Sequence, residues 1–393
     1  MTTPEAFIVS AVRTPFGKYF GGLSTTRPDD LLGSTLRTLM EKVPQIDPAQ
    51  IDDVIIGDSN GAGEDNRNVA RMGALLAGFP HTVPGVTLNR LCGSGAEAIV
   101  QGARAIKSGD ANFIISGGVE SMSRAPWIVE RTSKQEPVDP KFHQSTVGWR
   151  MTNPLMQSNW TASLGRCSEI VAERLGISRI EQDEWALRSH LLADAAWKRG
   201  LHDGWVIPFN NVTRDESIRP DSTMETLGNL ASVFSPNGAG TAGNSSPLND
   251  GCVATLITDG ARANEFGLEP IAKILASQVT ATDPDLFSLA PVSAIHKLLS
   301  KIDRNTSDID LWEINEAFAS MVLTVLHEIP EIDRDRVNVN GGAIAIGHPV
   351  GASASRVIVE CARELKRRGG GIGIVAACIG VGLGIAVAIE VSA

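Results

Sequence analysis

Aromatic residues, basic charge and long apolar runs are all scarce in this chain of 393 residues, which has one tyrosine and 5% aromatic side chains. Lys and Arg number 35 against 45 Asp and Glu, so the formal net charge at pH 7 is −10. The two signs are interleaved along the chain, which excludes an extended nucleic-acid surface and a basic membrane-binding face. No apolar stretch approaches the roughly 18 residues that a membrane span needs. We therefore expect neither a nucleic-acid nor a membrane partner.

Cysteine is also sparse, and its pattern excludes two structural roles. The chain has five cysteines and no CxxC pair. An odd number of separated thiols is not typical of a disulfide framework or a zinc site, so we expect no metal and a reducing compartment. The first six residues lack the basic segment of a signal peptide. The predicted location is the cytoplasm.

What the chain does contain is enough apolar material for more than one core. Its 42% hydrophobic and 20% charged residues are ordinary for a soluble globular protein. A length of 393 residues exceeds what one hydrophobic core usually fills, so two or more domains are expected. Short apolar runs punctuated by glycine alternate with amphipathic helical patterns, which predicts an α/β fold with a parallel or mixed sheet.

The two ends of the chain resemble each other in sequence. In each, an acidic lead enters a buried strand, and a second strand-like run, a glycine-rich loop, an amphipathic helix and a further buried strand come after it. The equivalent loops carry Cys92 and His348. The pattern predicts a duplicated α/β unit that brings these two loops together. The matching segments are residues 51–57 and 308–314, 86–89 and 337–340, and 113–118 and 372–377.

Residues 120–249 match neither half and are predicted to be an insertion from the first unit. Ser178 and Glu181 form a capping-box pattern that starts a helix running to about Trp197. Charged residues recur in and just after this helix, and we interpret them as a solvated face rather than a site. They are Glu181, Asp183, Glu184, Arg188, Asp194 and Lys198.

Cys92 is the residue most suited to nucleophilic chemistry. It lies among glycines at the predicted start of a helix, where free N–H groups and the helix dipole lower a thiol pKa from its usual ~8.5. Glycine also lets backbone N–H groups come close to a developing oxyanion. The alternative interpretation is a buried thiol that only packs.

Three further residues have both a chemical and a structural interpretation. His348 taken alone is typical of a turn, but the repeat places its loop opposite Cys92, where imidazole and thiol can converge. Cys378 follows a buried strand and precedes glycines, so it is either a second reactive thiol or a core residue. Asn315 follows another buried strand, and its alternative role is a helix cap.

Five motifs, in order along the whole chain, closely resemble those of the thiolase family. The resemblance implies the duplicated thiolase fold, in which two similar α/β/α units form a five-layered core with an inserted loop domain. It implies an N-terminal half of residues 1–120 and 250–269, a CoA-binding loop domain of residues 121–249, and a C-terminal half of residues 270–393. The motifs are NRLCGSG at 89–95, GGVESMS at 117–123, NEAF at 315–318, NGGAIAIGHP at 340–349 and CIGVG at 378–382.

The resemblance also implies roles for the reactive residues. Cys92 attacks the 3-keto carbon of a 3-oxoacyl-CoA, the Cα–Cβ bond breaks, and acetyl-CoA leaves as an enolate. Cys378 protonates that enolate and then takes the proton of incoming CoA, whose thiolate removes the acyl group from Cys92. His348 and a water held by Asn315 stabilise the thioester oxygen. The N–H groups of Cys92 and Gly380 stabilise the tetrahedral oxyanion.

Coenzyme A is thus implied as a substrate, with no tightly bound cofactor. By resemblance, Arg219 suits the nucleotide end of CoA, Ser246 contacts its pantetheine, and Phe318 lines the pantetheine channel next to Ala317. From the sequence alone, Arg219 has the alternative of a solvated surface charge and Phe318 that of core packing. The resemblance also implies a homodimer or a homotetramer.

Three sites depart from the usual pattern of this family. Residues 164–169, LGRCSE, stand where the family has Met-Gly-x-Thr-Ala-Glu, which alters the expected acyl pocket. Residues 351–356, GASASR, differ modestly on a predicted helix. Cys252 replaces a small alanine and is expected to be buried.

The leading hypothesis is an acetyl-CoA C-acyltransferase that cleaves a 3-oxoacyl-CoA with CoA. Residues 146–150 (TVGWR), 153–156 (NPLM) and 89–91 (NRL) are more similar to thiolases of aromatic-ring breakdown, which cleave 3-oxoadipyl-CoA. The runner-up is a biosynthetic acetoacetyl-CoA thiolase. A decarboxylating condensing enzyme is disfavoured because that group has a histidine in place of Cys378. A non-catalytic CoA-binding relative is disfavoured because all the reactive residues are present.

Overall fold

The computed structural model describes residues 4–131 and 140–393. Residues 1–3, which belong to the N-terminus predicted to lack a signal peptide, lie outside the described residues. So do residues 132–139, which belong to the predicted insertion. No helix within the described ranges is both long and apolar enough to cross a membrane.

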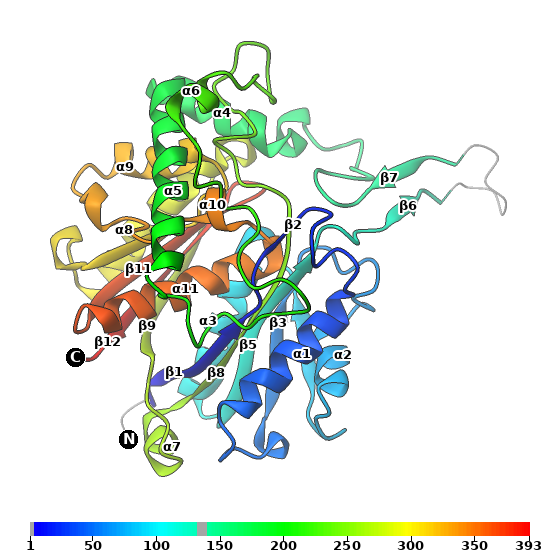
Figure 1. Cartoon of the computed structure of the whole chain (residues 1–393), viewed down its shortest axis with the longest axis vertical. Coiled ribbons are helices and arrows are strands. Elements are labelled where there is room, and N and C mark those ends of the chain that lie inside the picture. Colours follow the sequence, from blue (N-terminus) through cyan, green and yellow to red (C-terminus); the bar gives the residue numbers. More distant parts are fainter. Residues whose placement is uncertain (1–3, 132–139) are drawn as a thin grey trace.

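One mixed sheet runs through the molecule, and its strand order shows the duplication (Figure 1). From the β1/β9 junction, the first half runs β1-β8-β5-β3-β4 and the second runs β9-β12-β11-β10. In each half a parallel pair (β3 with β5, β10 with β11) joins antiparallel strands. The strands are β1 (Ala6–Arg13), β2 (Gly17–Lys18), β3 (Asp53–Gly57), β4 (Gly85–Leu88), β5 (Phe113–Ser121), β8 (Asn249–Asp259), β9 (Ala272–Ala281), β10 (Leu311–Ile314), β11 (Gly371–Ile379) and β12 (Leu383–Val391).

Six helices build the layers around this sheet (Figure 1). One apolar core joins α1 and α2 to the strands of the first half, and another joins α8 and α9 to those of the second. A third core holds α3 and α11 against strands of both halves. The order of layers is therefore helices, one half of the sheet, the paired central helices, the other half of the sheet, and helices, which confirms the predicted five-layered fold. The helices are α1 (Pro28–Glu41), α2 (Val69–Leu76), α3 (Ser94–Ser108), α8 (Ala290–Ile302), α9 (Ala319–Glu328) and α11 (Val350–Arg367).

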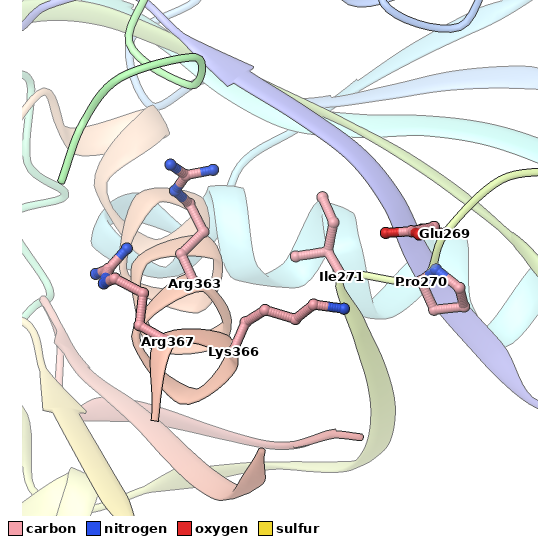
Figure 2. Close-up of a pocket in the computed structure, with 6 residues that line it drawn as sticks. All are labelled: Glu269, Pro270, Ile271, Arg363, Lys366 and Arg367. Atoms are coloured by element: carbon pink, nitrogen blue, oxygen red, sulfur yellow. The ribbon is translucent and has the colours of Figure 1, made fainter. Parts of the chain in front are cut away.

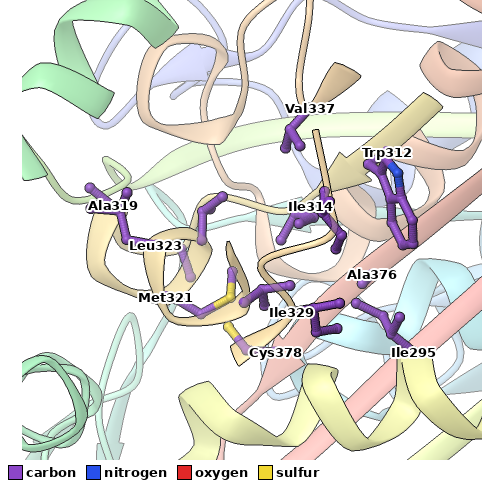
Figure 3. Close-up of a cluster of buried hydrophobic side chains, with 14 of the residues drawn as sticks. Ile295, Trp312, Ile314, Ala319, Met321, Leu323, Ile329, Val337, Ala376 and Cys378 are labelled. Atoms are coloured by element: carbon purple, nitrogen blue, oxygen red, sulfur yellow. The ribbon is translucent and has the colours of Figure 1, made fainter. Parts of the chain in front are cut away.

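The core against α8 and α9 is shown in Figure 3, where Trp312 and Cys378 lie among aliphatic side chains. Burying an aliphatic or aromatic side chain of this size stabilises the fold by about 1.5–3 kcal/mol. Cys378 is the penultimate residue of β11 and lies inside this cluster, so one of the two candidate reactive thiols is fixed by the packing of the second half.

The segment between β5 and β8 packs over the core and extends beyond it (Figure 1). Helix α5 begins after Ser178, whose side chain forms the predicted capping box with Glu181. The hairpin of β6 and β7 projects from the body. The predicted division into two halves and a loop domain stays a prediction. The elements here are β6 (Trp127–Val129), β7 (Phe142–Gln144), α4 (Leu164–Leu175), α5 (Arg179–Lys198) and α6 (Met224–Gly228).

Shorter helices complete the described chain. Helix α7 connects β8 to β9, and α10 lies just before His348. They span α7 (Gly260–Glu265) and α10 (Ala343–Ile346), and 3₁₀ turns cover Pro48–Gln50, Leu91–Gly93, Ser158–Thr161, Pro284–Leu289, Thr306–Asp308 and Arg334–Arg336.

The predicted solvated face of α5 is wrong at Asp183, which is buried. Its carboxylate pairs with Arg179 at 2.7 Å and accepts a hydrogen bond from Nδ2 of Asn244 at 2.9 Å. Asp194 is also largely covered and pairs with Arg214 and Lys198. Arg179 and Lys198 lie one turn away on α5 itself, but Asn244 and Arg214 come from other segments, so the helical pattern did not reveal them.

The predicted strand at residues 337–340 is also wrong. Val337 forms a single parallel bridge to Trp312, in the place that β4 occupies in the first half. Asn338 then adopts a positive φ of 47°, and its side-chain amide bonds the backbone of Ile314 with both Oδ1 and Nδ2 at 2.8 Å. A side chain thus replaces the ladder that a continued strand would have made.

Candidate active site

Cys92 lies on the turn between β4 and α3, and the turn is held close to the sheet. Leu91 has a positive φ of 47°, which is uncommon for a residue with a side chain. A Cβ on Gly57, at the end of β3, would lie 2.4 Å from the backbone of Ser94. Only glycine at this position lets the end of β3 and the start of α3 come this close. This close approach fixes the position of the Cys92 thiol.

The thiol of Cys92 is buried, and burial raises its pKa to about 11. The backbone N–H groups of Gly380 and of Cys92 itself donate to the sulfur and oppose this shift, while the nearby Glu120 carboxylate adds to it. The prediction of a lowered pKa is therefore wrong, because loss of water around the sulfur outweighs the helix terminus. The resting side chain is a neutral thiol at pH 7.

Cys378 lies at the end of β11, opposite Gly384 of β12. Burial raises its pKa well above that of an ordinary thiol, and the charge that Cys92 carries when ionised raises it further. The two sulfurs are thus near enough to interact electrostatically. The turn after Cys378 contains Val381 with a positive φ of 65°, and it directs the N–H of Gly380 at the sulfur of Cys92.

His348 is fixed through its backbone by the first half of the molecule. Gly347 has a φ of 118°, and a Cβ there would run into Asn249. The N–H of His348 donates to Oδ1 of Asn249 at 2.8 Å, and Nδ2 of Asn249 donates to the Gly17 carbonyl and the Ser217 hydroxyl, each at 2.9 Å. This amide network spans the two halves and sets where the imidazole lies.

The imidazole of His348 is neutral at pH 7, because burial lowers its pKa to about 4. The hydroxyl of Ser353 donates to the Pro349 carbonyl at 2.9 Å and lies 2.7 Å from Nδ1 of His348. In this arrangement the ring proton is on Nδ1, whereas it is on Nε2 when Ser353 turns its single proton to Nδ1. Nε2 is buried and has no partner among the described residues, so in the second tautomer it can donate to a substrate oxygen.

Asn315 also has buried side-chain polar atoms without a partner among the described residues. It follows β10, where its N–H donates to the carbonyl of Ala376 at 2.9 Å, and its side chain is fully buried. Neither Nδ2 nor Oδ1 has a partner among the described residues. Helix α9 begins later, with Phe318 as its N-cap, so Asn315 does not cap it. A buried amide without a protein partner costs roughly 1–3 kcal/mol, which is typical of a functional position.

The loops of Cys92 and His348 meet where α3 and α11 begin. A Cβ on Gly95 would lie 2.9 Å from the carbonyl of Gly351 and from the N–H of Ser355, so the two helix starts touch. Glu120 ties the start of α11 to the segment after β3, because its Oε2 accepts from the N–H of Gly351 at 3.0 Å and from that of Ser59 at 3.1 Å. Burial raises the pKa of Glu120 to about 7.

Four residues that the sequence interpretation did not assign help to position the site: Glu120, Asn249, Ser353 and Glu316. Glu316 is fully buried and accepts hydrogen bonds from Trp185 at 2.9 Å, Ser189 at 2.6 Å and Asn338 at 3.0 Å. For Glu120 and Glu316 a signal was present, since each is an acid within two residues of the end of an apolar strand. The other two gave none.

Three of the four predicted CoA-binding residues lie together beside Asn315. The N–H of Ser246 donates to the carbonyl of Ala317 at 3.0 Å. The ring of Phe318 packs edge to face with Phe234 at 5.6 Å between centroids. Arg219 is exposed, and its N–H donates to Nδ1 of His190 on α5 at 3.2 Å.

Two surface hollows lie apart from this constellation. One of about 270 Å³, drawn in Figure 2, lies at the C-terminal end of α11, about 20 Å along the helix from the His348 loop. Its lining is Glu269, Pro270, Ile271, Arg363, Lys366 and Arg367. The other, of about 490 Å³, is lined by residues of β9 and α8, namely Gln278, His296, Lys297, Ser300 and Lys301. Neither contains a predicted site residue. The described residues contain no group of three or more His, Cys, Asp or Glu that could hold a metal ion.

Family models match nearly all of the chain. The model described as "Thiolase, N-terminal domain" matches residues 6–261, and the one described as "Thiolase, C-terminal domain" matches residues 268–391. The chain belongs to the thiolase family. The predicted family and the predicted acyltransferase class are therefore confirmed. The predicted burial of Cys252 is also confirmed.

Named relatives support the same grouping. A protein of Pseudomonas knackmussii named "Beta-ketoadipyl-CoA thiolase" is 43% identical, over 98% of this chain and 99% of the relative. A protein of Escherichia coli K12 named "3-oxoadipyl-CoA/3-oxo-5,6-dehydrosuberyl-CoA thiolase" is 44% identical, over 96% and 97%. The structure of the Bacillus anthracis acetyl-CoA acetyltransferase superposes with a TM-score of 0.92 at 37% identity, over 99% of each chain.

Proposed function

We propose that this thiolase-family chain catalyses CoA-dependent cleavage of a 3-oxoacyl-CoA to acetyl-CoA and a shortened acyl-CoA, through an acyl group on Cys92. The supporting observation is that the buried thiols of Cys92 and Cys378 lie on neighbouring turns, while the His348 loop lies against the Cys92 loop. The N–H of Gly380 is directed at the sulfur of Cys92, and Nε2 of His348 and the amide of Asn315 have no partner among the described residues.

In the proposed cycle the negative charge passes between the two thiols, the enolate and CoA, so no net charge is gained or lost. The Cys92 thiolate bonds to C3, the C2–C3 bond breaks, and the acetyl-CoA enolate takes the proton of Cys378. The Cys378 thiolate then takes the proton of CoA, and the CoA thiolate displaces the acyl group from Cys92. The cycle returns Cys92 as a thiolate, and the proton that the resting thiol loses to solvent before the attack is regained in the free enzyme, because its pKa is raised to about 11.

The polar groups have distinct proposed roles in this cycle. Nε2 of His348 and the water held by Asn315 stabilise the thioester oxygen, and the N–H groups of Cys92 and Gly380 stabilise the tetrahedral oxyanion. A neutral imidazole suits this role, because it donates without placing a buried charge in the site. Removing one such donor typically costs 10²–10³-fold in kcat.

We propose that CoA enters along Ser246, Ala317 and Phe318, which lie beside Asn315, and that Arg219 contacts its nucleotide end. CoA is a substrate in this scheme, with no tightly bound cofactor. All five cysteines are free and buried, which supports a reducing cytoplasmic compartment. A homodimer or homotetramer is proposed, and sedimentation of the purified protein tests it.

The proposed acyl substrate is 3-oxoadipyl-CoA. The two named relatives at 43% and 44% identity and the segments at residues 146–150 and 153–156 support it. Acetoacetyl-CoA synthesis is the second candidate, since the superposing Bacillus anthracis structure is titled an acetyl-CoA acetyltransferase.

One assay separates these candidates. The purified protein is given CoA with 3-oxoadipyl-CoA, 3-oxohexanoyl-CoA or acetoacetyl-CoA, and products are identified by mass spectrometry and ranked by kcat/KM. We expect 3-oxoadipyl-CoA to rank first. An equal ranking would contradict the ring-breakdown substrate, and no CoA-dependent cleavage of any substrate would contradict thiolysis itself.

A further inference from the structure

An apolar wall covers the turn that holds Gly380. A Cβ placed on Gly380 would lie 3.2 Å from Cδ1 of Leu91, 3.4 Å from Cδ2 of Leu164 and 3.4 Å from Cη2 of Trp149. Nε1 of Trp149 donates to the carbonyl of Ala162 at 3.2 Å, which fixes the indole plane. Leu91 directly precedes Cys92, and a Cβ on Gly93, which follows it, would lie 2.4 Å from Cδ1 of Ile379, so an acyl group on the sulfur of Cys92 lies next to this wall.

Arg150 follows Trp149 directly and reaches the rim of the Cys92 turn. Its Nη2 donates to Oδ1 of Asn60 at 3.2 Å. The preceding carbonyl, of Ser59, accepts a hydrogen bond from Nδ2 of Asn89 at 2.7 Å, three residues before Cys92. The guanidinium is partly buried. It therefore lies between the segment that carries the apolar wall and the loop that carries the nucleophile.

The charge of Arg150 is not balanced by an acid in the part of the chain that the structure describes. Two other arginines on the segments of the wall are balanced. Arg90 pairs with Glu97 at 3.1 Å, and Arg166 pairs with Glu173 at 2.7 Å and Glu169 at 3.4 Å. Arg150 alone of the three offers its N–H groups to a neutral amide, and a carboxylate is a stronger acceptor for them.

We propose that Arg150 binds the distal carboxylate of a dicarboxylic acyl group and so selects such substrates over unbranched fatty acyl chains. This inference rests on the proposed thiolysis. In 3-oxoadipyl-CoA the carboxylate is three bonds beyond the carbon that bonds to Cys92, so it follows the acyl chain along the wall. The wall covers part of the path with apolar side chains, and the planar guanidinium matches both carboxylate oxygens.

The test compares two substrates of equal chain length in several variants. Arg150→Met keeps an apolar side chain but removes the charge. We expect its kcat/KM for 3-oxoadipyl-CoA to fall about 100-fold, the typical effect of losing a charged hydrogen-bond partner. Its kcat/KM for 3-oxohexanoyl-CoA, which lacks the carboxylate, stays within threefold. Arg150→Lys keeps the positive charge but lacks the planar guanidinium with its paired N–H donors. Its kcat/KM for 3-oxoadipyl-CoA should therefore lie between those of Arg150→Met and the unchanged protein.

Two control variants separate recognition from structure. Asn60→Ala removes the contact between the two segments and keeps the cation, so the ratio of the two kcat/KM values is expected to change little. Arg166→Met removes an arginine that already has acidic partners, and it also leaves the ratio unchanged.

An equal loss for both substrates in Arg150→Met, matched by Asn60→Ala, would show a purely structural role and overturn the proposal. A ratio that falls only in Arg166→Met would also overturn it. If the unchanged protein cleaves neither substrate with CoA, the proposed function fails instead, so the two failures are distinguishable.

Discussion

The two halves of the molecule share a strand order but differ in the connections between their equivalent strands. In the first half β5 leads into residues 122–248, which hold α4, α5 and α6, before the chain returns as β8. In the second half β11 turns back into β12 through residues 380–382 alone. Trp149 and Leu164 of the long connection lie beside Gly380, and the short connection presents the N–H of Gly380 to Cys92.

The two central helices also occupy equivalent places but follow loops with different reactive residues. The loop before α3 carries Cys92, and the loop before α11 carries His348. The loop before α3 contains Leu91 with a positive φ, whereas in the loop before α11 the positive φ belongs to Gly347. Duplication thus supplied two equivalent loops before the central helices, and the sequence differences gave them unlike chemistry.

The largest expected effect is on the nucleophile of the first half. We expect Cys92→Ala to lower kcat for thiolysis by at least about 10⁴-fold, because no other group can carry the acyl chain. Incubation with a 3-oxoacyl-CoA and then mass spectrometry should show no acyl group on the protein. Affinity for CoA serves as the control and should be unchanged. Substantial residual turnover would refute the role of Cys92.

The second-half thiol should behave differently. Cys378→Ala is expected to lower kcat by about 10³-fold, since general acid–base groups typically contribute 10²–10⁴-fold. Cys92 should still accept one acyl group in a single turnover, detected on its peptide by mass spectrometry. If Cys378→Ala also abolished acylation, the two thiols would not have separate roles.

The pH dependence of Cys92 ionisation shows whether burial, which raises the pKa of the thiol, outweighs the helix dipole, which lowers it. With its pKa raised to about 11, the thiolate fraction and the rate of iodoacetamide alkylation should rise about tenfold per pH unit between pH 7 and 10. An ordinary thiol would level off near its pKa of ~8.5. The measurement is peptide-resolved alkylation of the free enzyme. A plateau below pH 7.5 would instead favour a thiolate stabilised by the helix start.

The smallest expected effect concerns backbone strain in the short turn. Val381 has a φ of 65°, so Val381→Gly should relieve strain and raise the free energy of unfolding by about 1 kcal/mol, after the entropy cost of glycine is subtracted. Denaturant unfolding measures it. The matched control is Gly382→Ala, where φ is 74° and the new Cβ would lie 2.3 Å from the Thr282 carbonyl. That variant should be destabilised, and equal effects of the two changes would argue against strain at Val381.

Several elements could be predicted from sequence because their signals are local. The capping box of Ser178 and Glu181 starts α5 as expected, and the strands before Cys92 and after His348 lie where apolar runs predicted them. The prediction was wrong at residues 337–340, where the amide of Asn338 replaces a strand, and at Asp183, whose partner Asn244 lies far along the chain. Such partners depend on the fold and leave no periodic signal.

The sequence by itself determined the duplicated unit, the thiolase motifs and the identity of the reactive candidates, because periodicity and motif spacing are properties of the chain alone. The tertiary structure decided how those groups behave. It buried Cys92 and thereby raised its pKa, it kept His348 neutral, and it left Arg150 without an acidic partner among the described residues. Burial and charge pairing depend on which distant segments pack together, so they are settled only when the chain has folded.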